Sequence, residues 1–241
     1  MSHDKYENEP RKTCVVFFVI DTSDAMSGEK IRVVNSAIKE MIEQFKIINS
    51  DNLCAEIGVA ILAFSSGARW LTPNGPMKPE NYSWSDLDAG GKRDIGEAFR
   101  MLEEKLHRSS GFMQRANSSC KPIIFLMTDG EPTDVYKTHL ARLQNNWWFK
   151  ASNKVALAIG DEVNNHVLME FTGSNEAVVR PGNAGEKLAR MIKFIAVTDE
   201  QVCTDYGNDE DTNLSQIQSD LNVCLSSGDG RDDGTRNDAF D

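Results

Sequence analysis

The sequence has no long apolar run, and no stretch approaches the roughly 18 consecutive apolar residues that a membrane-spanning helix requires. The opening residues, MSHDKYENEPRK, lack the apolar core of a signal peptide. Cysteine is sparse, with five residues in a chain of 241, and no pair has the CxxC spacing. A disulfide framework and a zinc ribbon are therefore not indicated. We expect a protein of the reducing cytoplasm that does not interact with membranes.

Positive charge is also in short supply. The formal net charge is -11 at pH 7, whereas binding of nucleic acid requires a basic surface that neutralises phosphates. A nucleic-acid partner is therefore not expected. Most of the negative excess lies near the C-terminus, because residues 201–241 hold nine aspartates and one glutamate against two arginines. This segment is also rich in Gly, Ser and Asn, a composition that buries too little apolar surface to offset its ordering entropy.

The usual signatures of nucleotide-binding and hydrolytic proteins are missing. The sequence contains no Walker P-loop, no GxGxxG and no GxSxG. The four histidines are dispersed, without the spacing of zinc ligands: they are His3, His107, His139 and His166. These absences argue against a nucleotide site, a zinc site and a serine-hydrolase site.

The body of the chain alternates between apolar runs and helical patterns. A near-continuous apolar run such as CVVFFVI is typical of a strand that is buried on both faces of a sheet. Strands are predicted at residues 14–20, 56–64, 68–73, within 122–134, 154–160 and 176–181, and helices at 27–48, 94–109, 135–148, 163–173 and 184–198. This order predicts an α/β fold with a doubly wound, mostly parallel sheet, helices on both faces and one antiparallel hairpin edge strand.

These elements place a single domain at residues 12–198. A chain of this length can bury a full core as one domain of ordinary size plus an appendage. Residues 1–11 remain as an N-terminal extension, and residues 199–241 remain as an acidic tail that we expect to be disordered.

Two acidic residues follow the two most apolar strands. Asp21 ends the run in FVIDTSDAMS, and Asp129 follows the run in PIIFLMTDGEP. In a doubly wound sheet, ligands bind at the carboxyl ends of the strands. Either aspartate alone could be explained by an Asx-turn or a helix N-cap, but the pair favours a shared site. Ser23, two residues after Asp21, adds an oxygen at a spacing that suits a divalent cation.

The order of these motifs resembles a von Willebrand factor A (VWA) domain. The likeness rests on the stretches FVIDTSDAMSGEKIRVVNSAIKEMI, IGVAILAFSSGARWLTP, LDAGGKRDIGEAFRML, PIIFLMTDGEPTD and KVALAIG, and it covers roughly residues 12–198. Within that family, the sequence looks most like the bacterial TerY-like proteins of tellurite-resistance and stress gene clusters. The resemblance implies a non-enzymatic module for protein–protein interaction.

The resemblance also implies a metal-ion-dependent adhesion site. In that site a cation, usually Mg²⁺, is held by a DxSxS loop, by a Thr of a second loop and by an Asp of a third, and a partner carboxylate completes its shell. Asp21, Ser23 and Asp129 match three of the metal-ligand positions. Ala25 stands where the second hydroxyl of DxSxS would be, and Arg93 stands where the second-loop Thr would be.

Arg93 is the more consequential departure. Its guanidinium would repel a metal cation in the pocket where the carboxylates converge, and its planar shape suits a bridge between Asp21 and Asp129. Lys92 adds a second positive charge beside it. We therefore expect an internal cation in place of the metal and no cofactor, with Mg²⁺ possible but not favoured. The alternatives are that Arg93 points to solvent, or that a one-residue loop shift places it outside the site.

The predicted interaction surface consists of the loops at 21–27, 90–94 and 129–134. The candidate partner-binding residues are Asp21, Ser23, Asp24, Lys92, Arg93, Asp129, Glu131 and Asp134. The resemblance to TerY-like proteins implies a protein partner, such as a phosphatase or kinase of the same bacterial stress or signalling system.

Two other functions stay open at this point. The first is a VWA domain that still binds Mg²⁺ through Asp21, Ser23 and Asp129 and captures a partner carboxylate. The second is a Mg²⁺-dependent phosphotransferase of the haloacid-dehalogenase type, which also has an Asp at the end of its first strand. That chemistry needs a second Asp two positions later as a general acid, and residue 23 is a serine here.

Overall fold

The structure is a computed structural model. It describes residues 11–180 apart from 52–54, 114–118, 131, 161–162, 164 and 175–176. Its elements are, in order, β1 (Lys12–Asp21), the 3₁₀ turn η1 (Asp24–Met26), α1 (Glu29–Asp51), β2 (Ala55–Ser65), β3 (Gly67–Trp70), the 3₁₀ turn η2 (Pro79–Asn81), α2 (Ile95–Lys105), β4 (Ile123–Thr128), α3 (Tyr136–Asn145), α4 (Trp147–Ala151), β5 (Asn153–Ala158), α5 (Asn165–Thr172) and β6 (Val178–Val179).

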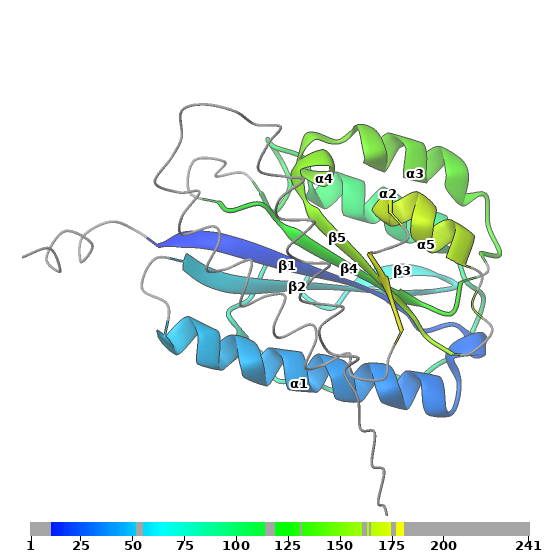
Figure 1. Ribbon diagram of the computed structural model, residues 1–241, viewed down its shortest axis with the longest axis horizontal. Coiled ribbons are helices and arrows are strands. Elements are labelled where there is room, and N and C mark those ends of the chain that lie inside the picture. Colours follow the sequence, from blue (N-terminus) through cyan, green and yellow to red (C-terminus); the bar gives the residue numbers. More distant parts are fainter. Residues whose placement is uncertain are drawn as a thin grey trace, which may run out of the picture.

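The strands form one six-stranded sheet in the order β3-β2-β1-β4-β5-β6. Every neighbouring pair is parallel except β2 and β3, which form the expected antiparallel hairpin at one edge. In Figure 1, α1 lies on one face of the sheet, and α2, α3, α4 and α5 lie on the other. The predicted fold class is therefore confirmed. The direction of winding reverses between β1 and β4, so a ligand crevice is expected at the carboxyl ends of these two strands.

The core lies on both faces of the sheet because alternate residues of a strand point in opposite directions. On the α1 face, the buried ring of Phe18 on β1 stacks against Phe125 on β4 and Phe45 on α1, with centroid distances of 5.5 and 6.2 Å. On the opposite face, Phe17 belongs to the cluster that α2, α3 and α5 cover. Both faces of β1 are thus buried, which explains why its sequence is apolar throughout.

The predicted helix at 135–148 is wrong as a single element. The chain leaves helical geometry at Asn146, whose backbone is extended, and then enters α4. The Asn146 side chain accepts hydrogen bonds from the backbone N–H groups of Trp148 and Phe149, at 2.9 and 3.2 Å, and so acts as the N-cap of a new helix. As a result Trp148 and Phe149 are buried, whereas Trp147 is exposed.

Most other differences from the predicted elements concern their ends. The first helix begins at Glu29 and not at residue 27. Gly28 has a φ of 77°, in the left-handed region, so the helix cannot extend back through it. Cys14 and Cys120 are buried, as small hydrophobic residues would be. None of the helices that the structure describes is both long and apolar enough to cross a membrane. The predicted helix at 184–198 and the acidic tail lie outside the described residues.

Candidate functional site

Asp21 is fully buried at the end of β1. The parallel pairing of β1 with β4 places Ile20 opposite Met127, so the residues that follow in each strand also meet. The Thr128 hydroxyl donates a hydrogen bond of 2.6 Å to Oδ2 of Asp21, and the backbone N–H of Ser23 donates one of 2.8 Å to Oδ1. The carboxylate is therefore fixed by donors on both of its oxygens. Thr128 was not among the residues predicted from the sequence.

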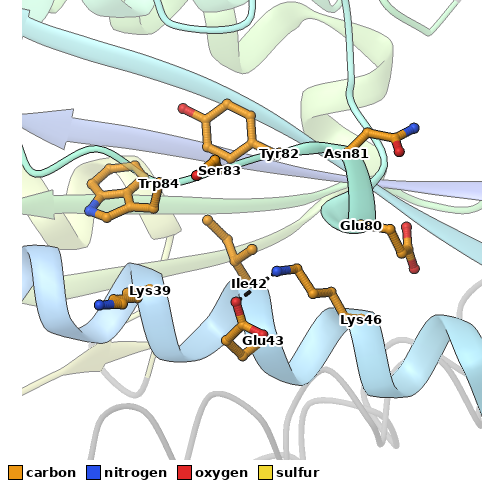
Figure 2. Close-up of a pocket in the computed structure, with 9 residues that line it drawn as sticks. All are labelled: Lys39, Ile42, Glu43, Lys46, Glu80, Asn81, Tyr82, Ser83 and Trp84. Carbon is orange, nitrogen blue, oxygen red and sulfur yellow. Dashed lines mark hydrogen bonds and ion pairs between the residues drawn. The ribbon is translucent and has the colours of Figure 1, made fainter.

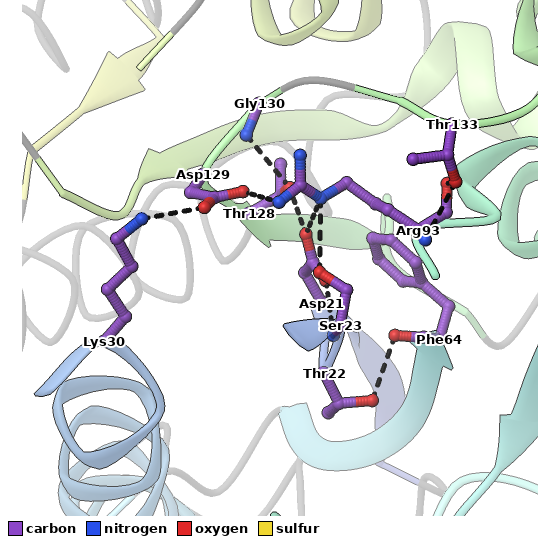
Figure 3. Close-up of polar contacts among 10 residues, drawn as sticks. All are labelled: Asp21, Thr22, Ser23, Lys30, Phe64, Arg93, Thr128, Asp129, Gly130 and Thr133. Atoms are coloured by element: carbon purple, nitrogen blue, oxygen red, sulfur yellow. Dashed lines mark hydrogen bonds and ion pairs between the residues drawn. The ribbon is translucent and has the colours of Figure 1, made fainter. Parts of the chain in front are cut away.

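Arg93 lies between the two aspartates (Figure 3). Its Nε is 2.7 Å from Oδ2 of Asp21 and 3.3 Å from the Ser23 hydroxyl oxygen, and its Nη2 pairs with Oδ1 of Asp129. The Arg93 side chain is 7% exposed. The predicted bridge is thus confirmed, and the two alternatives, a solvated Arg93 and a loop shifted out of the site, are wrong.

The second cation of the site is Lys30, on the first turn of α1. Its Nζ lies 2.8 Å from Oδ2 of Asp129, and its side chain is 36% exposed. Lys92, the second positive charge predicted beside Arg93, has an exposed side chain and forms no ion pair with these two carboxylates. The backbone N–H of Lys92 donates a hydrogen bond of 3.0 Å to the Ser66 hydroxyl.

One feature of the sequence could have pointed to Lys30. A lysine in the first turn of a helix faces the positive end of the helix dipole, which is unfavourable unless an anion lies close by. Lys30 is the second residue of α1, and Asp129 is the compensating anion. Its sequence position therefore indicated a nearby acid, although it could not say which one.

The loop that carries Arg93 is held by its backbone. The Thr133 hydroxyl accepts from the Arg93 N–H and donates to the Arg93 carbonyl oxygen, both at 2.9 Å, and the Thr133 N–H donates to the same oxygen at 3.0 Å. On the other side, the Asp24 N–H bonds to the Gly91 carbonyl oxygen at 2.9 Å. The first, second and third loops are therefore joined to one another, which fixes the position of the guanidinium.

Asp134 caps α2 from the third loop. Its Oδ2 accepts a hydrogen bond of 2.8 Å from the N–H of Gly96, while Asp94, at the N-cap position of α2, instead accepts from the Gly67 N–H at 2.8 Å. This close approach requires a glycine at position 96, because a Cβ there would lie 2.9 Å from the Cα of Tyr136. The structure thus gives Asp134 a capping role that the sequence analysis did not predict. Its contact with a partner stays a prediction.

Two substitutions of Asp134 distinguish the effect of its negative charge on stability from the effect of its hydrogen bond. Burial raises the pKa of the Asp134 carboxyl, and the Asp94 carboxylate raises it further, against the lowering effect of the Gly96 hydrogen bond. A raised pKa means that the folded state favours the neutral form, so the contribution of this group to stability increases as the pH falls. We expect Asp134→Ala to lose about 1 kcal/mol of unfolding free energy, and Asp134→Asn, which keeps an acceptor, to stay within about 0.5 kcal/mol of wild type at pH 7.

Urea denaturation of the three proteins at about pH 7 and about pH 4 measures both effects. The unfolding free energy of wild type should rise relative to that of Asp134→Asn when the pH is lowered from about 7 to about 4. An Asp134→Asn variant as unstable as Asp134→Ala would show that the negative charge, and not the acceptor, is what α2 requires.

The remaining predicted residues divide between the interior and the surface. Ser23 is buried with Asp21, whereas Asp24 and Ala25 are exposed. Glu131 lies outside the described residues. Val135, which the sequence analysis did not single out, is 81% exposed and follows directly after Asp134. An apolar side chain therefore stands in solvent directly after the third loop.

A second feature of the surface is a groove of about 300 Å³ between α1 and η2, shown in Figure 2. Ile42 and the aromatic rings of Tyr82 and Trp84 line it. Lys46 and Glu43, which also line it, form an ion pair of 2.7 Å with each other. With Lys39 and Glu80, which also line it, the groove has equal numbers of positive and negative side chains. The cluster at the strand ends remains the stronger candidate for a functional site.

The sequence matches the von Willebrand factor type A domain family over residues 16–226. The chain belongs to this family. This VWA domain is 32% identical over 140 residues to the mouse protein named inter alpha-trypsin inhibitor, heavy chain 4, a segment that makes up 58% of this chain and 14% of that protein. The human inter-alpha-trypsin inhibitor heavy chain H4 is 31% identical over 137 residues, again 14% of its length. The chain thus spans a small part of these curated relatives.

Solved structures of low identity share the fold. A von Willebrand factor type A protein from Catenulispora acidiphila superposes with a TM-score of 0.58 at 17% identity, over 77% of this chain and 43% of that one. A proximal thread matrix protein 1 from the mussel byssus, in which zinc occupies the adhesion motif, gives 0.56 at 16% identity, over 78% and 48%. The finer resemblance to bacterial TerY-like proteins finds no support among these relatives and stays a hypothesis.

The residues of this VWA domain do not fit the metal that its family implies. The nitrogen atoms of Arg93 and Lys30 already lie against the carboxylate oxygens that would be metal ligands. Ala25 supplies no oxygen where the family has a hydroxyl. A metal would have to displace two cations from a buried site, and its own charge would be repelled by both.

Proposed function

We propose that this VWA domain is a non-enzymatic protein-interaction module whose adhesion site is closed by internal cations, so that it binds its partner without a bridging metal. VWA domains are a family of protein-interaction modules, which supports the general function. The observation that carries the specific proposal is the burial of Arg93 between Asp21 and Asp129. The degenerate adhesion site then acts as a support for the surface loops rather than as the point of contact.

The contact surface in this proposal is the rim around the cluster. Asp24 and Lys92 are exposed on the first and second loops, and Val135 adds an apolar side chain after the third. An apolar residue surrounded by polar ones is a common arrangement at interfaces. Asp21, Ser23 and Arg93, which are buried, would determine the shape of this surface from beneath.

The two other functions are less well supported by the geometry. A domain that still captures Mg²⁺ would require Arg93 to leave two carboxylates that it contacts directly. A phosphotransferase would require Asp21 to attack a phosphorus atom, yet this carboxylate is fully buried and is held by three donors. A cytoplasmic stress or signalling system, with a phosphatase or kinase as partner, is the setting that the TerY resemblance suggests for the proposed module.

Capture of a partner by the immobilised chain tests this function. We expect a protein captured from an extract of the source organism to be retained equally in EDTA and in millimolar Mg²⁺, because no metal bridges the two proteins. Val135→Asp should abolish its capture by placing a charge in the interface. Ile47→Asp, at a residue on α1 that is 54% exposed, is the matched control and should have no effect. Release of the partner by EDTA would favour the Mg²⁺-dependent alternative, and equal capture by both variants would place the contact surface elsewhere.

A further inference from the structure

We infer that Arg93 and Lys30 together replace the divalent cation of the family charge for charge, and that the site can accept a metal only when both are removed. The inference rests on the proposed closed adhesion site and extends it to Lys30. Each carboxylate oxygen that faces the cluster has a cationic partner: Asp21 Oδ2 and Asp129 Oδ1 contact Arg93, and Asp129 Oδ2 contacts Lys30 at 2.8 Å.

The charges of the cluster balance only when Lys30 is included. Asp21 and Asp129 carry two negative charges, which a divalent cation would neutralise in the family's site. Arg93 supplies one positive charge, and Lys30 supplies the other. The side chains of Asp21 and Asp129 are 0% and 9% exposed, so a net charge left here would be poorly hydrated and costly. A single internal cation would therefore leave the site incompletely compensated.

The Lys30 side chain passes close to the backbone of Gly160. Gly160, in the loop after β5, has a φ of 109°, and a Cβ at that position would lie 2.9 Å from the Cε of Lys30. The glycine thus leaves the space through which the lysine stem reaches Asp129. In Figure 3, Lys30 extends from α1 toward Asp129 on the side opposite to Arg93. This arrangement differs from that of a lysine whose ammonium group is free in solvent.

Removal of one cation leaves the other to repel a metal. In Arg93→Thr, which restores the family's second-loop residue, the ammonium of Lys30 still lies against Asp129. In Lys30→Met, the guanidinium of Arg93 still bridges both acids. A positive side chain within a few ångströms repels Mg²⁺ more strongly than it would a monovalent ion, and more strongly near a protein surface than in bulk water. Each remaining cation should therefore weaken Mg²⁺ binding by at least about tenfold.

The test compares the Mg²⁺ dependence of the melting temperature, and the Mg²⁺ affinity from calorimetry, in five proteins. These are wild type, Lys30→Met, Arg93→Thr, the double variant with both changes, and a control with Lys92→Met and Arg93→Thr. We expect Mg²⁺ to raise the melting temperature only in the Lys30→Met/Arg93→Thr variant, with an affinity at least about tenfold above either single variant. Lys92 is equally close in sequence to the site but exposed, so its removal should add nothing.

Two outcomes would overturn the inference. Arg93→Thr alone could bind Mg²⁺ as tightly as the double variant, or the Lys92 control could match it; in either case Lys30 is not a counter-ion of the site. A Mg²⁺ response of the wild-type protein would instead contradict the proposed closed site, so the two failures are distinguishable. If the double variant does not fold without metal, the neutral pair Lys30→Gln/Arg93→Gln, which keeps hydrogen-bonding groups, provides the same comparison.

Discussion

Arg93→Ala should cost the domain about 3–5 kcal/mol of unfolding free energy, a large part of the stability of an ordinary domain. The truncation removes the partner of Asp21, which is fully buried and has no other cation within contact among the described residues. Asp129 keeps Lys30, so the loss falls mainly on Asp21. A buried charge without its counter-ion is destabilising because the protein interior solvates it poorly.

Chemical denaturation with a matched surface variant isolates this effect. Arg100 on α2 pairs with Glu97 at 2.6 Å, but its side chain is 37% exposed, so Arg100→Ala should cost no more than about 1 kcal/mol. Asp21→Asn combined with Arg93→Ala should lose less than the sum of the two single changes, since neither charge is then left unpaired. An Arg93→Ala variant within about 0.5 kcal/mol of wild type would show that the guanidinium contributes nothing as a counter-ion.

Phe18→Ala should lose a similar amount, about 3–5 kcal/mol, for a different reason. Phe18 lies on β1, the strand that ends at Asp21, and it is fully buried. Its ring stacks on those of Phe125 and Phe45, so truncation leaves a cavity between β1, β4 and α1. Two contributions are lost: the favourable free energy of removing the ring from water, and the contacts that its neighbours no longer make.

Urea denaturation with two controls separates the cavity from general effects of substitution. Phe18→Leu keeps most of the volume and should cost clearly less than Phe18→Ala. Ile47→Ala, at an exposed position on α1, should stay within about 0.5 kcal/mol of wild type. The dependence of the unfolding free energy on urea should not change, because a cavity alters stability without altering the surface exposed on unfolding. A Phe18→Ala variant as stable as Phe18→Leu would contradict the packing described for this face.

The fold could be predicted from the sequence because its main determinant is local. A run such as CVVFFVI has apolar side chains on both faces, and only a strand between two layers of helices buries both. Element ends were less accurate. The pattern at 135–148 continues across Asn146, where hydrogen bonds from Asn146 to the next N–H groups end one helix and begin another. The spacing of apolar residues does not indicate that the helix breaks at Asn146.

The sequence by itself determined the acids of the candidate site and the substitution that matters most to it. Asp21, Ser23 and Asp129 occupy recognisable positions at the ends of apolar strands, and Arg93 is visible as a departure from the family motif. Only the tertiary structure assigned Lys30 to Asp129, a residue 99 positions away, and left Lys92 in solvent. The physical reason is that apolar patterning encodes which side of an element is buried, whereas an ion pair depends on which side chains the completed sheet brings within contact distance.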